Sequence, residues 1–132
     1  MKRKRATAIV EMPDGILLVS HSILGKPTFM LPGGGIKRKE TPSAAVAREL
    51  YEETGLCALE MIYLFEAITK FHKHKVFLIK KFTGKLKSRR EIRHINFYSK
   101  KVNLKLAKHV LPIINKYKDY LSQKNISKFI DI

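Results

Sequence analysis

A glycine run followed by a capped helix constrains the fold of this chain more than any other feature. Glycines 33–35 form a segment of high backbone freedom. Thr41 and Pro42 then combine a favoured N-cap residue with proline at the first helical position. Small and apolar residues between 44 and 50 form a packing face, and Gly55 suits a left-handed C-terminal cap. The pattern predicts a short helix that begins at Pro42 and ends before Gly55.

Acidic residues gather on this helix although the sequence contains only eleven of them. Glu49, Glu52 and Glu53 follow an i, i+3, i+4 spacing, which places them on one helix face. Mutual repulsion and the negative end of the helix dipole each disfavour this arrangement by about a few tenths of a kcal/mol. A solvated acidic face is the ordinary interpretation of such a pattern. The adjoining glycine run, the cap and the packing face favour a site for Mg²⁺ or Mn²⁺, which prefer oxygen ligands.

The 23 residues from Gly34 to Leu56 resemble the Nudix box. In that motif a glycine is followed after five residues by glutamate, and after seven more by Arg-Glu-aliphatic-x-Glu-Glu-x-Gly-aliphatic. Every specified position is matched in this chain, by Gly34, Glu40, Arg48, Glu49, Leu50, Glu52, Glu53, Gly55 and Leu56. Phe29-Met30-Leu31-Pro32-Gly33 is also similar to the aromatic-x-Leu-Pro-Gly lead-in of the family. The resemblance implies an α/β (α+β) fold, a Nudix-like α/β/α sandwich with a mixed β-sheet between helices.

The resemblance also implies a set of metal ligands. Glu49, Glu52 and Glu53 would bind Mg²⁺ or Mn²⁺, and the carbonyl of Gly33 would be the backbone ligand. Arg48 would orient a carboxylate of the box through a charge-assisted hydrogen bond.

The implied chemistry is attack of water on a phosphorus atom of a diphosphate bridge, with a cation that neutralises oxygen charge and lowers the pKa of the water. Glu49 and Glu91 are the candidates for accepting the proton of that water. For Glu91, an isolated exposed acid in a basic loop is the alternative interpretation. Glu40 would support the glycine loop or the start of the helix.

Several residues near the box have other interpretations. Many family members have Gly-Glu where this chain has Lys39-Glu40, so the turn is expected to differ in conformation. His72 and His74 could bind a metal, but we expect exposed strand or loop residues. Cys57 is expected to be a packed thiol.

The rest of the chain predicts strands before and after the box. Residues 5–12 and 15–20 should form a hairpin, because Pro13-Asp14-Gly15 is a turn signal. Further strands are predicted at 59–69, 75–82 and 92–98, with Phe77 and Phe82 in the core. Residues 104–121 show helical spacing, with a possible kink or break at Pro112. The apolar tail 126–132 is expected to dock on the core or on a partner.

Composition sets the class of protein. A chain of 132 residues is expected to form one domain, 1–132, with the box at 34–56. Its apolar runs are shorter than the roughly 18–20 residues that span a bilayer, and a single cysteine suits a reducing compartment. We therefore expect a cytoplasmic protein without membrane contact, as a monomer or homodimer.

The net charge of +16 concentrates in one segment: residues 70–101 hold twelve lysines and arginines and one acid. Such a field attracts polyanions, RNA among them, although a solvated basic surface explains it equally well.

Three functions remain in view. The first is hydrolysis of a nucleoside diphosphate derivative, such as a nucleoside triphosphate, a nucleotide sugar or a dinucleoside polyphosphate. The alternatives are an RNA 5′-end pyrophosphohydrolase and a non-catalytic nucleotide-sensing module. His72, Lys73 and His74 stand where proline or tyrosine would mark some subfamilies, which disfavours specialists for ADP-ribose or diadenosine polyphosphates.

Overall fold

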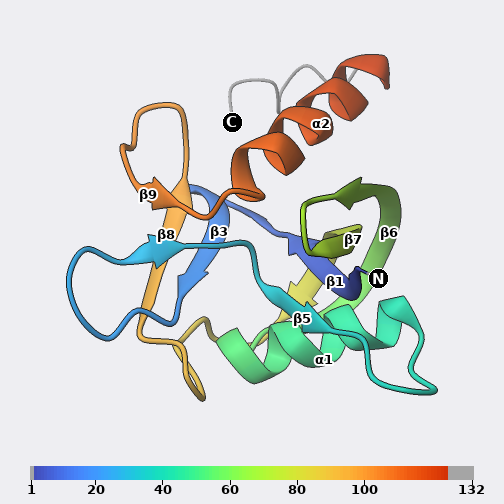
Figure 1. Ribbon diagram of the computed structural model, residues 1–132, viewed down its shortest axis with the longest axis horizontal. Helices are drawn as coiled ribbons and strands as arrows, with labels where there is room; N and C mark the ends of the chain where they lie inside the picture. The colour runs from blue at the N-terminus through green and yellow to red at the C-terminus, as the bar shows by residue number, and fades with distance from the viewer. Residues whose placement is uncertain (1, 125–132) are drawn as a thin grey trace.

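The computed structural model describes residues 2–124, so the predicted docking of the tail 126–132 lies outside the described residues. Within residues 2–124 the chain forms nine strands and two helices (Figure 1). In chain order they are β1 Arg3–Ile9, β2 Glu11–Met12, β3 Gly15–Ser20, β4 Thr28–Phe29, β5 Gly33–Gly35, α1 Pro42–Thr54, β6 Cys57–Ile68, β7 His72–Thr83, β8 His94–Tyr98, β9 Lys105–Leu106 and α2 Val110–Gln123.

The main sheet is mixed. Its strand order is β5-β1-β7-β6, with β1 parallel to β7 and antiparallel to β5. A second sheet has the order β2-β3-β8, and β4 pairs with β9 in parallel. Because β1 and β5 are neighbours, the glycine segment lies directly beside the first strand.

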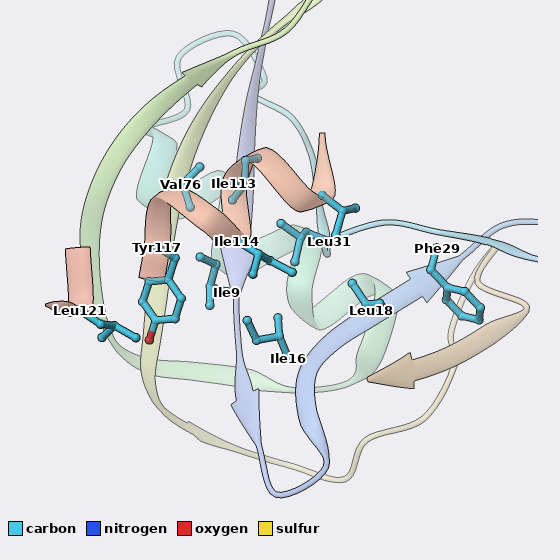
Figure 2. Close-up of a cluster of buried hydrophobic side chains, with 11 residues drawn as sticks. Ile9, Ile16, Leu18, Phe29, Leu31, Val76, Ile113, Ile114, Tyr117 and Leu121 are labelled. Carbon is cyan, nitrogen blue, oxygen red and sulfur yellow. The ribbon is translucent and has the colours of Figure 1, made fainter. Parts of the chain in front are cut away.

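Alternate strand residues face two different helices. Ala6 and Ala8 of β1 lie in a buried cluster with Ala45, Val46 and Leu50 of α1. Ile9 lies instead in a cluster that includes Ile113, Ile114 and Tyr117 of α2, shown in Figure 2. The sheets are therefore covered by α1 on one side and α2 on the other, as Figure 1 shows. This arrangement confirms the predicted α/β/α sandwich.

The predicted hairpin is correct only at its tip. The run 5–12 is divided at Val10: β1 joins the main sheet, and only Glu11 and Met12 pair with β3. Val10 is fully buried, and its carbonyl accepts a hydrogen bond from the N–H of Leu17 at 2.9 Å. The run 5–12, predicted as one strand, thus contributes strands to two different sheets.

The C-terminal helix is shorter than predicted. It begins at Val110, because residues 105–106 form β9 and pair with β4. Pro112 therefore lies in the first turn of α2, where a missing backbone N–H does not interrupt the helix. Among the described residues, neither helix is both long and apolar enough to cross a membrane.

Two residue-level expectations are wrong. His74 is 2% exposed and buried, because its position on β7 faces the interior, where its Nδ1 lies 2.9 Å from Oγ1 of Thr7. Cys57 is exposed, because it begins β6 at the edge of the main sheet. Phe77 is buried as expected, and Phe82 is partly buried against the cluster beneath α1.

Candidate active site

Helix α1 fixes the positions of the acidic side chains, and it is capped as the sequence predicts. Oγ1 of Thr41 accepts a hydrogen bond from the N–H of Ala44 at 3.2 Å. At the other end Gly55 adopts φ 79°, and its N–H donates to the carbonyl of Tyr51 at 2.9 Å. Glu53 therefore lies in the last turn of α1, where it is buried, with 6% of its surface exposed.

Arg48 is the centre of the polar network. Its Nε and Nη2 donate to the carboxylate of Glu40 at 2.7 and 2.9 Å. Its Nη1 donates to Glu49 at 2.7 Å and to Glu52 at 2.9 Å, and Nη2 also donates to the carbonyl of Gly35 at 3.1 Å. The guanidinium thus offsets the repulsion among the acids and ties the helix to the glycine segment.

The charge of Arg48 changes the acid–base properties of its partners. Its hydrogen bonds, followed by the backbone N–H of Lys37, lower the pKa of Glu40 to about 2. The pKa of Arg48 is raised in turn, first by its hydrogen bond to Glu40. Glu40 is therefore an ionised anchor between the loop and the helix.

Glu53 differs from the other acids because it is buried. Its Oε1 accepts a hydrogen bond from the N–H of Gly33 at 3.0 Å. Burial, together with the negative charges of Glu49 and Glu52, raises its pKa to about 8 against the opposing effects of Gly33 and Arg5. A nearby cation would favour the charged form of this carboxyl.

The glycines of β5 make room for this arrangement. A Cβ on Gly34 would lie 2.4 Å from Cδ of Glu49, so the carboxylate packs directly on the backbone. A Cβ on Gly33 would lie 2.2 Å from the carbonyl oxygen of Ala6 on β1. Gly33 is therefore required by the backbone beside it, whereas Gly34 leaves room for the side chain of Glu49.

A cavity of about 130 Å³ adjoins the acids. It is lined by Glu49 and Glu53 together with residues from outside the helix: His21, Arg90, Glu91 and Ile92. Glu91 is exposed, as expected for an isolated acid in a basic loop. It also lines this cavity, as its interpretation as the proton acceptor requires.

Sequence reasoning missed His21 and Arg90. Nε2 of His21 lies 3.9 Å from Oε2 of Glu53, and Nη1 of Arg90 lies 3.0 Å from Oε1 of Glu52. Each of them adjoins a feature that the sequence did predict: His21 directly follows the strand β3, and Arg90 directly precedes the candidate base Glu91. In a segment of so many cations, however, Arg90 could not be distinguished by charge.

The donor set fits a hard divalent cation. Among residues 2–124, no three acidic, histidine or cysteine side chains already form a group ready to enclose an ion. Arg48 instead supplies positive charge to Glu49 and Glu52. Glu49 and the buried Glu53 line one cavity, and Glu52 pairs with Arg90, which lines the same cavity. Carboxylate oxygens are the ligands that Mg²⁺ and Mn²⁺ prefer.

Residues 1–114 match the family model described as the NUDIX domain. The chain belongs to the Nudix hydrolase family. A solved structure from Chromobacterium violaceum, assigned to the nudix hydrolase family, is 38% identical, with a TM-score of 0.82 over 92% of this chain and 79% of that chain. The MutT NUDIX hydrolase from Burkholderia pseudomallei shares the fold at 20% identity, with a TM-score of 0.75 over 88% of this chain and 98% of that chain.

Two curated relatives match only part of this chain, and the matched segment is less than half of each relative. Diphosphoinositol polyphosphate phosphohydrolase 2 from Rattus norvegicus is 34% identical over 58% of this chain and 45% of its own length. An RNA pyrophosphohydrolase from Saccharophagus degradans is 37% identical over 45% of this chain and 35% of its own length. The chain thus spans less than half the length of these two relatives.

The one departure from the common Nudix pattern has a defined geometry. Lys39 adopts φ 64°, the left-handed conformation that glycine reaches without steric cost. Lys37 and Glu40 close the turn, through a bond from the N–H of Lys37 to Oε1 of Glu40 at 2.9 Å. The glutamate therefore reaches Arg48 although a lysine occupies the turn.

Proposed function

We propose that this chain is a metal-dependent hydrolase that cleaves the diphosphate linkage of a nucleoside diphosphate derivative: a nucleoside triphosphate, a nucleotide sugar or a dinucleoside polyphosphate. The observation that carries the proposal is the buried Glu53, which shares a cavity with Glu49 and has a pKa raised to about 8. A carboxyl in this position is costly to ionise unless a cation binds beside it.

In this proposal Glu49, Glu52, Glu53 and the carbonyl of Gly33 hold Mg²⁺ or Mn²⁺. When bound, the cation neutralises charge on the phosphate oxygens and lowers the pKa of the attacking water. Arg48 holds the carboxylates of Glu49 and Glu52 in position through the bonds described above. Glu49 or Glu91 accepts the proton of the water, since both line the cavity.

The test is a hydrolysis screen with Mg²⁺ and with Mn²⁺. The panel contains nucleoside triphosphates, nucleotide sugars, dinucleoside polyphosphates, triphosphorylated and capped RNA, and, because of the rat relative, a diphosphoinositol polyphosphate. We expect metal-dependent release of phosphate, pyrophosphate or a nucleotide from at least one compound.

Glu53→Gln should reduce that turnover by about 100-fold or more, because it removes the charge of one ligand but keeps the oxygen that accepts from Gly33. Glu60→Gln is the matched control, since Glu60 is exposed on β6, pairs with Lys81 at 3.6 Å and does not line the cavity of the acids. Inactivity of the wild-type protein on the whole panel with both metals would contradict the proposal. Nucleotide binding without turnover would favour the sensing module instead.

An RNA 5′-end pyrophosphohydrolase is the second candidate, supported by a basic surface with an exposed aromatic ring. A shallow cavity of about 620 Å³ is lined by Lys2, Arg3, Lys70, Phe71 and His72. Phe71 is 66% exposed, and Nζ of Lys70 lies 5.4 Å from the centre of its ring. Cations beside an exposed ring suit a single strand, whose phosphates pair with lysines and whose bases stack. The bacterial relative carries an RNA pyrophosphohydrolase name.

Salt separates the two candidates. If RNA is the substrate, the logarithm of kcat/KM on 5′-triphosphate RNA should fall linearly and steeply with the logarithm of salt concentration, because RNA binding releases counterions. Phe71→Ala should weaken that RNA activity and leave hydrolysis of a mononucleotide unchanged. A flat salt response on the RNA would reject this candidate.

A further inference from the structure

The turn 89–92 carries two charged residues to the mouth of the cavity, and its backbone is held from both sides. The N–H of Arg89 donates to the carbonyl of Glu53 at 3.0 Å, and the N–H of Ile92 closes the turn on the carbonyl of Arg89 at 3.0 Å. Beyond the turn, the N–H of Arg93 donates to the carbonyl of Ser20 at 2.8 Å. The turn is therefore attached to the end of α1 and to the end of β3, the two elements that border the site.

Arg90 occupies an unusual backbone conformation within this turn. Its φ is 53°, in the left-handed region that is sterically unfavourable for a residue with a Cβ. Ile92 is 4% exposed and anchors the segment in the interior. Such a conformation persists because the surrounding bonds fix it, and its effect is to direct Arg90 toward the acids.

The side chain of Arg90 contacts one of the three box acids. Its Nη1 lies 3.0 Å from Oε1 of Glu52, the same oxygen that accepts from Nη1 of Arg48 at 2.9 Å. Two guanidinium groups thus share one carboxylate oxygen, and Arg90 itself lines the cavity. Arg48 is held by four other hydrogen bonds, whereas the Arg90 side chain is 61% exposed.

We propose that Arg90 is a catalytic residue that leaves Glu52 to bind the phosphoryl oxygens of the substrate when Glu52 serves as a ligand of the divalent cation. The inference rests on the proposed function and adds a residue to it. A cation on Glu52 repels the guanidinium that holds the same oxygen. The anchored turn keeps the released group over the cavity, and its planar N–H donors match the oxygens of a phosphate.

Neighbouring cations are less suited to this role. The guanidinium of Arg89 stacks on the ring of Tyr51, with 4.5 Å between Cζ and the ring centre. Arg93 follows the turn and is exposed, and it is not among the residues that line the cavity. Arg93→Gln is therefore the matched control for Arg90→Gln, since both substitutions remove one positive charge from the same loop.

Two binding measurements on the full chain test the proposal without turnover. Titration with Mn²⁺ alone, followed by electron paramagnetic resonance, measures competition for Glu52. Titration with methylenediphosphonate in saturating Mn²⁺, followed by calorimetry, measures binding of a diphosphate that cannot be hydrolysed. Arg90→Gln should bind Mn²⁺ about two- to fivefold more tightly than Arg93→Gln, because an exposed competing ion pair is lost. The affinity of Arg90→Gln for the bisphosphonate should be lower than that of Arg93→Gln by a factor of about ten or more.

Arg90→Lys keeps the charge but loses the planar donors, so its bisphosphonate affinity should fall between those of wild type and Arg90→Gln. The same order is expected for kcat/KM on any substrate found in the screen. Equal values for Arg90→Gln and Arg93→Gln in either titration would overturn the proposal. If the wild-type chain binds Mn²⁺ but Arg90→Gln shows no difference, only this inference fails. If the wild-type chain binds no Mn²⁺, the proposed hydrolase function fails as well.

Discussion

Gly34 and Glu49 lie in such close contact that the site depends on the absence of a single methyl group. The three atoms nearest to the Cβ that alanine would add at residue 34 all belong to the carboxylate of Glu49, which is the end of a flexible side chain. The box spacing predicted that Glu49, Glu52 and Glu53 share a face. The structure brings Glu49 and Glu52 together around Arg48 and places Glu53 in the cavity that Glu49 also lines. Spacing could not indicate His21 or Arg90, since both reach the cavity through contacts distant in the sequence.

Gly34→Ala should separate folding from activity. We expect the free energy of unfolding to change by less than about 1 kcal/mol, because the side chain of Glu49 can move aside. The displaced carboxylate should lower kcat/KM by about 10- to 100-fold. Chemical denaturation and steady-state kinetics measure the two effects. Gly35→Ala is the control, since a Cβ there has no atom within 4 Å; equal activity losses in both variants would contradict the argument.

At the level of elements, the sequence pattern correctly predicted a helix whose ends are set by local residues. It failed where pairing with a strand distant in the sequence sets the structure. Helix α1 was predicted with both of its ends, because Thr41, Pro42 and Gly55 act locally. Helical spacing over 104–107 was misleading, because β9 pairs with β4, a partner more than 70 residues away. The division of the first apolar run at Val10 has the same cause, since β1 and β2 belong to different sheets.

A partly buried hydrogen bond joins helix α2 to β2. The hydroxyl of Tyr117, a fully buried residue, donates to Oε2 of Glu11, and burial followed by this bond raises the pKa of Tyr117. Tyr117→Phe should lower the free energy of unfolding by about 1–3 kcal/mol, because a charge-assisted hydrogen bond is lost. Tyr120→Phe removes a hydroxyl from the same helix and should cost less in the same urea titration. Equal losses would show that the contact contributes little.

Across the whole molecule, acid stability should reflect two histidines whose pKa is lowered by burial, one of which, His74, was expected at the surface. Burial lowers the pKa of His74 to about 3, helped by the charges of His109 and Arg5, and it lowers the pKa of His109 to about 4. An exposed position was expected because lysines flank His74, but strand alternation turns it inward against Thr7. The burial of His74 is therefore determined by its position in the sheet and not by the charge of its neighbours in the sequence.

The sign of the pH effect follows from these shifts. Because the folded-state pKa of His74 is depressed below 6.5, its contribution to stability is present above pH 6.5 and is lost as the pH falls toward 3. Glu53 acts in the opposite direction, since its pKa of about 8 makes the metal-free fold gain stability as the pH falls below 8. A comparison of variants is therefore needed to isolate the histidine.

His74→Gln can keep a hydrogen bond to Thr7 but cannot take up a proton. Relative to wild type, its free energy of unfolding should rise by about 1–2 kcal/mol between pH 7 and pH 5. Urea titrations in EDTA at a series of pH values measure this difference. His21→Gln, at a half-exposed position, should show a smaller change. Parallel curves for wild type and His74→Gln would refute the assignment of acid sensitivity to His74.

The turn 89–92 has an evolutionary consequence. Surface loops usually drift in length, but this one is bonded to α1 and to β3 within four residues of chain. An inserted or deleted residue there would break the register of one attachment or the other. Relatives with the same attachments should therefore diversify at this turn by exchanging side chains, whereas the exposed segment 23–26, which includes Ile23 and Leu24, has room to lengthen.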